Sequence, residues 1–239
     1  NKSPVLNMAL MPDGSYIAVN TDNYLVHCSA SAISWTTIDD NIKIQALTVR
    51  PDGSLAAAGT NNKLYIRAGI ETNQSWREVT GITTSIINVA NDAEGNLLVI
   101  DTDNNVHTLY PNVDAHLIEN HSFNTEVVSG VVVDASTGMV TGIGPGNKLY
   151  TKTSLQTGTW QPLTENAGPW LSINMGPDGN YVFTGDDNIG NSGGTSPKDA
   201  AQQLDNKHTI LDLAVMADGS YIAVNTDNEL VQCSVNATE

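Results

Sequence analysis

Basic residues are scarce in this chain. Only 10 Lys and Arg face 26 Asp and Glu among 239 residues, which gives a formal net charge of -16 at pH 7. Because such a chain repels phosphate backbones and anionic lipid surfaces, we expect no nucleic-acid partner. No apolar run approaches the ~20 residues of a membrane-spanning helix, and no signal segment precedes Asn1. We therefore expect a soluble chain without membrane insertion, starting as a mature form would.

Strong helical patterns are also rare. The chain is rich in Asn, Asp, Thr and Gly and poor in Lys and Arg, a composition typical of short strands joined by many turns. A single patch, "SPKDAAQQL" at residues 196–204, has helical character. We therefore expect an all-β fold.

Catalytic and metal-binding signatures are missing. No Gly-x-Ser-x-Gly elbow, phosphate-binding loop or His-Glu-x-x-His helix occurs. The five histidines show no metal-ligand spacing; they are His27, His107, His116, His121 and His208. We expect no enzyme activity, no zinc site and no cofactor.

What the chain does have is a repeat. The stretch "DGSYIAVNTDN" occurs at Asp13–Asn23 and again at Asp218–Asn228, with related apolar runs and turns between the copies. Six turn glycines follow one another at intervals of 39 to 43 residues: Gly14, Gly53, Gly95, Gly138, Gly179 and Gly219. A period near forty residues, with several strands in each repeat, is typical of a β-propeller.

The second repeat shows how each one is built. Its runs "IQALTV", "SLAAAG", "KLYIRA" and "SWREVTG" predict four strands, and "RPDG" and "TNN" supply the turns between the first three. We expect the innermost strands to be the most apolar. Because a lone sheet of this size cannot bury its faces, neighbouring sheets must stack. The sequence predicts one domain, a six-bladed β-propeller over residues 1–239, with repeats at about 1–41, 42–81, 82–124, 125–167, 168–207 and 208–239.

Two repeats depart from the pattern. The last one stops at "LVQCSVNATE" without a fourth strand, so we expect an incomplete last blade whose open edge could support a homo-oligomer. In the fifth, "NIGNSGGTSPKDAAQQLDN" replaces both outer strands. The cysteines Cys28 and Cys233 occupy equivalent places in the first and last repeats, too far apart for a bridge, so we expect two free thiols.

The outer strands carry a family resemblance. In "LYIRAGIETNQSWREVTGI" and "LYTKTSLQTGTWQPLTENAG", a Leu-Tyr-x-Lys/Arg strand precedes a Trp by about ten residues, and "LVHCSASAISWTTIDDNI" is a weaker copy. The pattern resembles the tectonin-type repeat, and the fold is then similar to tectonin and tachylectin-like propeller lectins. The third repeat has His116 in place of the Trp.

The resemblance implies a multivalent lectin that recognises N-acetylglucosamine-type or modified terminal sugars at shallow pockets on the rim of the propeller. Asn and Asp turns beside aromatic faces suit sugar hydroxyls and pyranose rings, and several weak sites gain avidity on glycans and glycoproteins. The candidate sugar-binding residues are Trp170, Trp35, Trp76, Trp160, Tyr24, Tyr65, Tyr150, Asn23, Asn62, Asn105, Asn147 and Asn228. For the repeated aromatic residues, packing between blades is the competing interpretation. Trp170 lies outside the repeating position and is the better ligand candidate, although it could also cap the channel.

Two alternatives stay open. A non-catalytic protein-interaction scaffold would use the same rim, as WD-repeat propellers do, although the chain lacks their Gly-His and Trp-Asp pairs. Six-bladed propellers also include enzymes, which need convergent charged groups at the channel, and arginine occurs here only at Arg50, Arg67 and Arg77.

Calcium and glycosylation are the remaining possibilities. The oxygen-rich segments Asp101–Asn105 and Gly185–Asn188 could bind Ca²⁺, but turn chemistry already explains their composition. Four Asn-x-Ser/Thr sequons, at Asn1, Asn73, Asn120 and Asn236, favour an extracellular, secreted protein.

Overall fold

The fold is built almost entirely from short β-strands, as the computed structural model shows. It describes residues 5–29, 35–92, 95–109, 119–122, 130–134, 136–154, 157–163, 169–175, 181–185, 189–191, 202–205, 210–215, 220–225, 227 and 230–233. Over these ranges there is no α-helix, only a 3-10 turn at Pro145–Asn147. No helix of the described residues has the length and hydropathy to cross a membrane.

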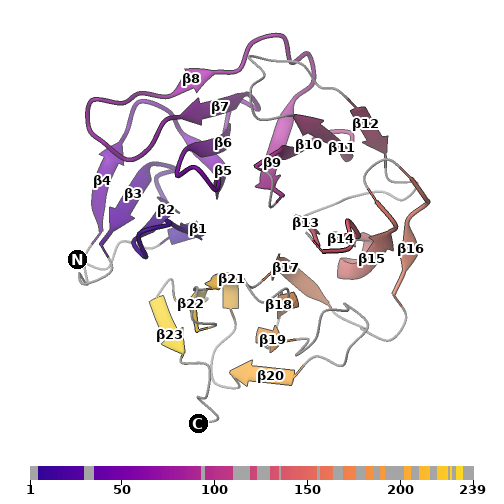
Figure 1. Cartoon of the computed structure of the whole chain (residues 1–239). Helices are drawn as coiled ribbons and strands as arrows, with labels where there is room; N and C mark the ends of the chain where they lie inside the picture. Colours follow the sequence, from indigo (N-terminus) through magenta and orange to yellow (C-terminus); the bar gives the residue numbers. More distant parts are fainter. Residues whose placement is uncertain are drawn as a thin grey trace. The chain divides into compact units, whose positions relative to one another are not determined.

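The chain divides into two compact units, Asn1–Ser122 and Phe123–Glu239. The first unit contains three antiparallel sheets, each with four strands (Figure 1). In chain order the strands are β1 (Val5–Leu10), β2 (Tyr16–Asn20), β3 (Leu25–Cys28), β4 (Thr36–Asp39), β5 (Ile44–Val49), β6 (Leu55–Gly59), β7 (Leu64–Arg67), β8 (Arg77–Glu78), β9 (Ile86–Asn91), β10 (Leu97–Asp101), β11 (Asn105–Leu109) and β12 (Glu119–Ser122).

The second unit repeats this plan in three more sheets. Its strands are β13 (Gly130–Val133), β14 (Val140–Gly144), β15 (Lys148–Lys152), β16 (Gln161–Pro162), β17 (Trp170–Met175), β18 (Tyr181–Gly185), β19 (Ile189–Asn191), β20 (Gln202–Asp205), β21 (Ile210–Val215), β22 (Tyr221–Asn225) and β23 (Leu230–Cys233). The last sheet has three strands among the described residues. The predicted four-stranded repeat is therefore confirmed in five sheets, and in the second sheet each predicted run contains the observed strand.

The fifth sheet corrects two expectations. Its outer strands are present, because β19 pairs with β18 and β20 pairs with β19. Residues 202–204 of the patch predicted to be helical therefore lie in a strand. Backbone pairing with β19 overrides the weak local helical preference. The other residues of the patch lie outside the described residues.

Burial is greatest in the second strand of each sheet. Every residue of β6, β10, β14 and β18 is buried, whereas the first strands, such as β1 and β9, alternate buried and half-exposed positions. The expectation that the innermost strands have the most apolar sequences concerns composition and not burial, and it stays a prediction. The second strand of a sheet is hydrogen-bonded to another strand along each edge. Its faces pack against neighbouring sheets, so little of the strand is exposed.

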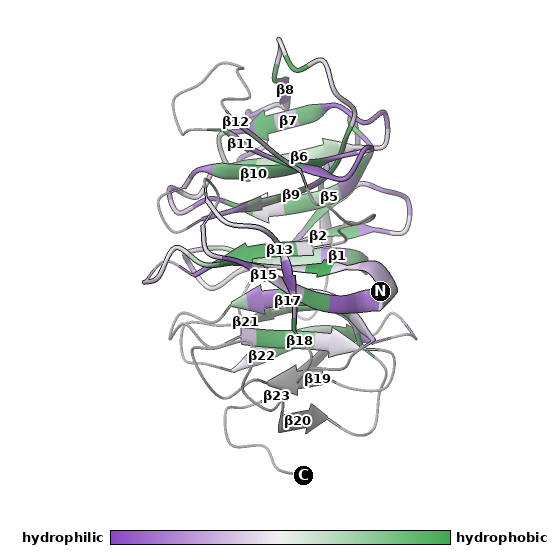
Figure 2. Ribbon diagram, turned by 90° about the vertical axis from the view of Figure 1, so that its right-hand side faces the viewer, coloured by the Kyte–Doolittle hydropathy of each residue, from purple (hydrophilic) through white to green (hydrophobic). Residues whose placement is uncertain are grey.

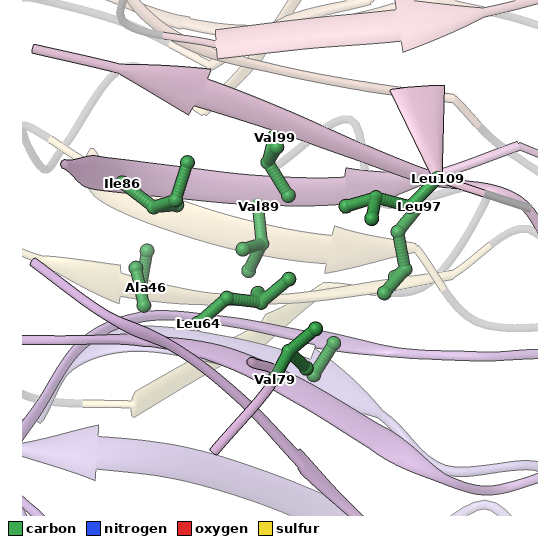
Figure 3. Packing of buried hydrophobic residues seen from close by; sticks show 10 residues of the cluster. Ala46, Leu64, Val79, Ile86, Val89, Leu97, Val99 and Leu109 are labelled. Carbon is green, nitrogen blue, oxygen red and sulfur yellow. The ribbon is translucent and has the colours of Figure 1, made fainter. Parts of the chain in front are cut away.

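Facing sheets within a unit are held by apolar side chains. In the first unit, β5 lies beside β1 and β9, and a cluster between the second and third sheets includes Leu64, Val79, Ile86, Val89 and Val99 (Figure 3). Burial of each such side chain contributes ~1.5–3 kcal/mol. Figure 2 shows the corresponding apolar colouring along β7 and β10, with hydrophilic residues in the turns.

The Pro-Asp-Gly turns between first and second strands are closed by their own side chains. The Asp13 carboxylate accepts hydrogen bonds from the backbone and hydroxyl of Ser15, and Asp52 does the same with Ser54. These bonds lower the pKa of both carboxyl groups. Gly14 and Gly53 both have φ of +81°, the conformation for which glycine is suited. Cys28 in β3 is buried, and the side chain of Cys233 lies outside the described residues, so the expectation of two free thiols stays a prediction.

Candidate binding rims

Asparagine in the left-handed conformation marks the turn between second and third strands. Asn23, Asn62, Asn104 and Asn147 all have positive φ, between 55° and 67°, and each lies nine residues after its turn glycine. The equivalent residue in the third repeat is thus Asn104, not the predicted Asn105. Asn228 has the same spacing but lies outside the described residues. We call this end of each sheet the Asn rim, and the end with the Pro-Asp-Gly turns the Asp rim.

These asparagines join neighbouring sheets of the first unit. The carbonyl of Asn23 accepts the backbone N–H of Ile44, and that of Asn62 accepts the N–H of Ile86, at 2.8 and 2.7 Å. In both cases the donor is the first residue of the next sheet. Gln45 adds side-chain bonds to the Asn62 amide oxygen and the Ile86 carbonyl. The left-handed conformation therefore has a structural role, since it directs a carbonyl at the next sheet.

This geometry predicts different losses for two substitutions of Asn62, both of which remove the side-chain bond to Gln45. We expect Asn62→Ala to destabilise the chain by about 1.5 kcal/mol, because alanine also disfavours positive φ. We expect Asn62→Gly to cost only about 0.5 kcal/mol, because glycine adopts this φ freely. Urea unfolding of both variants checks this; equal losses would show that the side chain matters and the backbone conformation does not.

An aromatic ring covers a glycine at the Asn rim of three sheets. A Cβ on Gly59 would lie 2.8 Å from the ring of Tyr65, and one on Gly144 would lie 2.6 Å from the ring of Tyr150. In the fifth sheet the ring of Trp170 packs over Gly185, 3.4 Å from such a Cβ. The Trp170 ring comes from the first strand of its sheet. It occupies the position that a tyrosine ring from the third strand occupies in the second and fourth sheets. The absence of a glycine side chain provides the space for each ring.

The third sheet replaces this pair with a buried, hydrogen-bonded pair of side chains. Asp101 and His107 stand where Gly59 and Tyr65 stand in the second sheet, and Asp101 Oδ2 lies 2.7 Å from His107 Nε2. Asp101 Oδ1 also accepts the backbone N–H groups of Asp103 and Asn105. Both members of the pair are buried. The predicted site residue Asn105 donates its amide to Asp101 and so belongs to this network.

The network predicts a sensitivity to acid. Burial raises the pKa of Asp101, but the hydrogen bonds from His107 and Asn105 outweigh it, so the pKa is lowered overall. A carboxyl whose folded-state pKa is depressed stabilises the fold above its unfolded pKa of about 3.9, and this stabilisation is lost as the pH falls further.

We therefore expect Asp101→Asn to be less stable than the wild type at pH 7, with a difference that shrinks at pH 3. Guanidinium unfolding at the two pH values measures it, and Asp103→Asn, at an exposed position, is the control. A difference that is the same at both pH values would contradict the assignment.

The tryptophans of the tectonin-like pattern lie at the other end of the sheets. Trp35, Trp76 and Trp160 each come just before a fourth strand, and β4 begins at Thr36 opposite His27 and ends at Asp39 opposite Leu25. Each fourth strand therefore starts at the Asp rim. The structure does not bring these three tryptophans together with the Asn turns. It brings Tyr24, Tyr65 and Tyr150 to them, and it places Trp170 at the corresponding end of the fifth sheet, over Gly185.

Most of the candidate rings have packing partners. Trp160 is only 8% exposed and Tyr65 only 5%, while Trp76 is half-buried against the apolar cluster between the first two sheets. The Tyr65 hydroxyl accepts a bond from the Asn61 amide at 2.8 Å. Trp170 lies 5.1 Å from Phe183 between ring centroids, and Lys43 Nζ lies 5.0 Å above the ring of Tyr24. Trp35, Trp170, Tyr24 and Tyr150 keep part of their surface exposed.

Acidic side chains are exposed on the Asn rim of the first unit. Asp22, Asp40 and Asp103 are exposed there. The two lysines that the structure describes in this unit are engaged, Lys43 with Tyr24 and the Asp22 carbonyl, and Lys63 with Glu78 at 2.8 Å. Leu6, near the start of β1 at the same rim, is 45% exposed. This rim thus offers carboxylate and amide groups beside a small apolar surface.

No metal site is formed by the residues that the structure describes. Among them, no three His, Cys, Asp or Glu side chains gather in a geometry that could hold an ion. In the predicted calcium segment Asp101–Asn105, the carboxylate of Asp101 is already surrounded by donors. Residues 186–188 of the second predicted segment lie outside the described residues.

The first strands are almost free of charge. Across β1, β5, β9, β13, β17 and β21 the only charged residue is Asp212, which is buried. General acid and base chemistry needs positioned titratable groups. These strands therefore offer amide, hydroxyl and apolar groups.

Comparison with known proteins gives a distant match. No protein-family model matches the chain. An uncharacterized WD repeat-containing protein of Synechocystis sp. (strain PCC 6803) is 26% identical over 143 residues, which is 59% of this chain. Together with the small antiparallel four-stranded sheets, this match indicates a β-propeller-like repeat. The aligned part covers 41% of that protein, so the chain spans less than half of its relative's length.

Proposed function

We propose that this chain is a non-catalytic interaction scaffold whose six sheets close into a six-bladed β-propeller. The observation that carries the proposal is the distribution of polar groups. Exposed aspartates such as Asp22 and Asp103 lie on the turns, whereas the first strands hold one buried charge among the residues described. Propellers commonly offer a rigid surface of turns to other molecules. A WD repeat-containing relative supports this class of role.

The Asn rim is the proposed contact surface. Its exposed acidic residues, Asp22, Asp40 and Asp103 in the first unit, suit a partner with positive charge, and charge complementarity raises association rates and specificity. The turns themselves are fixed by backbone bonds such as Asn23 N–H to the Asn20 carbonyl. A rigid surface limits the entropy lost on binding.

The test compares two charge-reversal variants. Asp22→Lys with Asp103→Lys alters the Asn rim, and Glu71→Lys alters an exposed site in the β7–β8 loop, which leaves from the Asp rim. We expect a partner captured stoichiometrically by the wild type to bind the first variant at least tenfold more weakly, about 1.4 kcal/mol, and the second unchanged. Equal binding to all three proteins would refute the Asn rim as the contact surface.

Sugar binding is the second candidate function. It is favoured by the half-exposed rings of Tyr24, Tyr150 and Trp170, which lie at the Asn rim beside amide groups such as those of Asn23 and Asn147. A partly open ring beside amides can stack on a pyranose while the amides bind its hydroxyls. The other candidate tryptophans lie at the opposite rim and supply no such pairing.

A glycan array probed with and without calcium distinguishes the two functions. If the chain is a lectin, N-acetylglucosamine-type or modified terminal sugars bind selectively, and Tyr24→Ala reduces the signal while circular dichroism shows an intact fold. A folded protein that binds no glycan on the array leaves the scaffold as the function. Binding that needs calcium would point to an ion site outside the described residues.

A further inference from the structure

Only one of the four sequons lies in an exposed turn that the structure describes. It is Asn73-Gln74-Ser75, in the loop between β7 and β8. Asn120 lies in the middle of β12, where it pairs with His107 of β11 in the strand register. Asn1 and Asn236 lie outside the described residues. The structure therefore separates sequons that look equivalent in the sequence.

The side chains of this sequon alternate between the solvent and the protein. Asn73 and Ser75 are exposed, whereas Gln74 between them is half-buried. The Gln74 side chain packs over Gly69, where a Cβ would lie 3.1 Å from its Oε1. Because Gln74 is directed inward, the two residues that a glycosyl-transferring enzyme must recognise are accessible together.

Hydrogen bonds hold the backbone of this loop in place. The Gln74 N–H donates to the Glu71 carbonyl at 3.0 Å, which makes a tight turn with Asn73 in it. The guanidinium of Arg67, 1% exposed, donates to the carbonyls of Gly69, Glu71 and Gln74. The carbonyls on both sides of Asn73 are thus bound from within, and the Asn73 side chain takes no part in that network.

We propose that Asn73 is an N-glycan acceptor. The co-reactant is an oligosaccharide linked through its reducing-end carbon to a polyprenyl pyrophosphate. The Asn73 side-chain nitrogen forms a bond to that carbon and loses a proton, while the carbon–oxygen bond to the pyrophosphate breaks and the lipid pyrophosphate leaves. The Ser75 hydroxyl completes the recognition sequence.

The acceptor lies away from the proposed contact surface. Strand β7 ends at Arg67 opposite Leu55, the first residue of β6, so the loop with Asn73 leaves from the Asp rim. A bulky glycan at this position increases solubility and hinders contacts around the Asp rim of its own sheet. The Asn rim of the same sheet stays accessible, so the inference is independent of which ligand binds there.

The test is site-resolved mass spectrometry of the full chain expressed with a cleavable leader in a eukaryotic host. Enzymatic removal of N-glycans in water labelled with heavy oxygen converts an occupied Asn73 into labelled Asp. We expect this label at Asn73 in most molecules, its absence in Asn73→Gln and Ser75→Ala, and its presence in Ser75→Thr. Both the secreted and the retained protein are measured, so poor export does not obscure the result.

An unlabelled Asn73 in both the wild type and Ser75→Thr would overturn the proposal. The melting temperature of Asn73→Gln is the folding control. We expect it to agree within about 2 °C with that of the enzymatically deglycosylated wild type, which carries Asp at this position, as is usual for exposed substitutions that remove no contact.

Discussion

The Gly59→Asp substitution is expected to destabilise the chain by about 3 kcal/mol, and adding Tyr65→His is expected to recover most of the loss. A side chain on Gly59 meets the Tyr65 ring, which lies 2.8 Å from the position of its Cβ. The third sheet shows the alternative in the equivalent places, where Asp101 and His107 form a buried pair at 2.7 Å. The double variant copies that pair into the second sheet.

A double-mutant cycle measures how strongly the two substitutions, Gly59→Asp and Tyr65→His, compensate for each other. Urea unfolding of the wild type, both single variants and the double variant gives the coupling energy, for which we expect about 3 kcal/mol in favour of the double variant. Tyr65→His alone should cost about 1 kcal/mol, because it leaves a small cavity above the glycine, so the double variant should be only about 1 kcal/mol less stable than the wild type. A double variant no more stable than Gly59→Asp would show that the two sheets do not share one geometry.

Arg67→Ala is the second substitution for which we expect a large loss, about 4 kcal/mol. The Arg67 guanidinium is buried and donates to three carbonyls of the β7–β8 loop. Its Nε also lies 3.8 Å from a carboxylate oxygen of Asp39 in the neighbouring sheet. Burial lowers the pKa of Arg67, and Asp39 acts in the opposite direction. Without the guanidinium, the buried Asp39 carboxylate loses its positively charged neighbour, and three carbonyls each lose one donor.

Three further variants give this prediction its specificity. Arg67→Lys should recover only part of the loss, because an ammonium group lacks the planar fork of donors. Asp39→Ala combined with Arg67→Ala should be more stable than Arg67→Ala alone, because no buried carboxylate then lacks a positively charged neighbour. The exposed Arg77 serves as the control, with an expected loss under about 0.5 kcal/mol on substitution by Ala. Urea unfolding measures the loss of stability, and limited proteolysis measures the loosening of the β7–β8 loop. A small loss of stability for Arg67→Ala would contradict the role of Arg67 in holding this loop.

Arg67 also explains part of the sequence pattern. The Leu-Tyr-x-Lys/Arg motif looks like a surface feature, because a basic residue at a strand end is normally solvated. In the second repeat its tyrosine covers Gly59 and its arginine holds the following loop. Two residues singled out by the resemblance thus have structural roles that the repeat pattern alone does not distinguish from binding. The sequence contains a signal for the packing of tyrosine over glycine, since a glycine lies six residues before both Tyr65 and Tyr150.

Much of the architecture could be predicted because it depends on local chemistry. The spacing of the turn glycines predicts the number and order of the strands, and Pro-Asp-Gly and Asn turns need particular backbone angles that few other residues adopt. The fifth repeat was the exception. There the Gly- and Ser-rich stretch and the helical patch concealed the strands Ile189–Asn191 and Gln202–Asp205, because short strands are stabilised by their partners more than by their own composition.

The sequence by itself determined the all-β repeat, the turn residues and the scarcity of catalytic groups, because these follow from composition and from spacing along the chain. Only the tertiary structure decided which end of a sheet each candidate occupies and which rings are covered. Trp35, Trp76 and Trp160 lie at the Asp rim, whereas Trp170 lies over Gly185 at the Asn rim. Strand direction and packing against the neighbouring residues set these positions, and both depend on residues that are distant in the sequence.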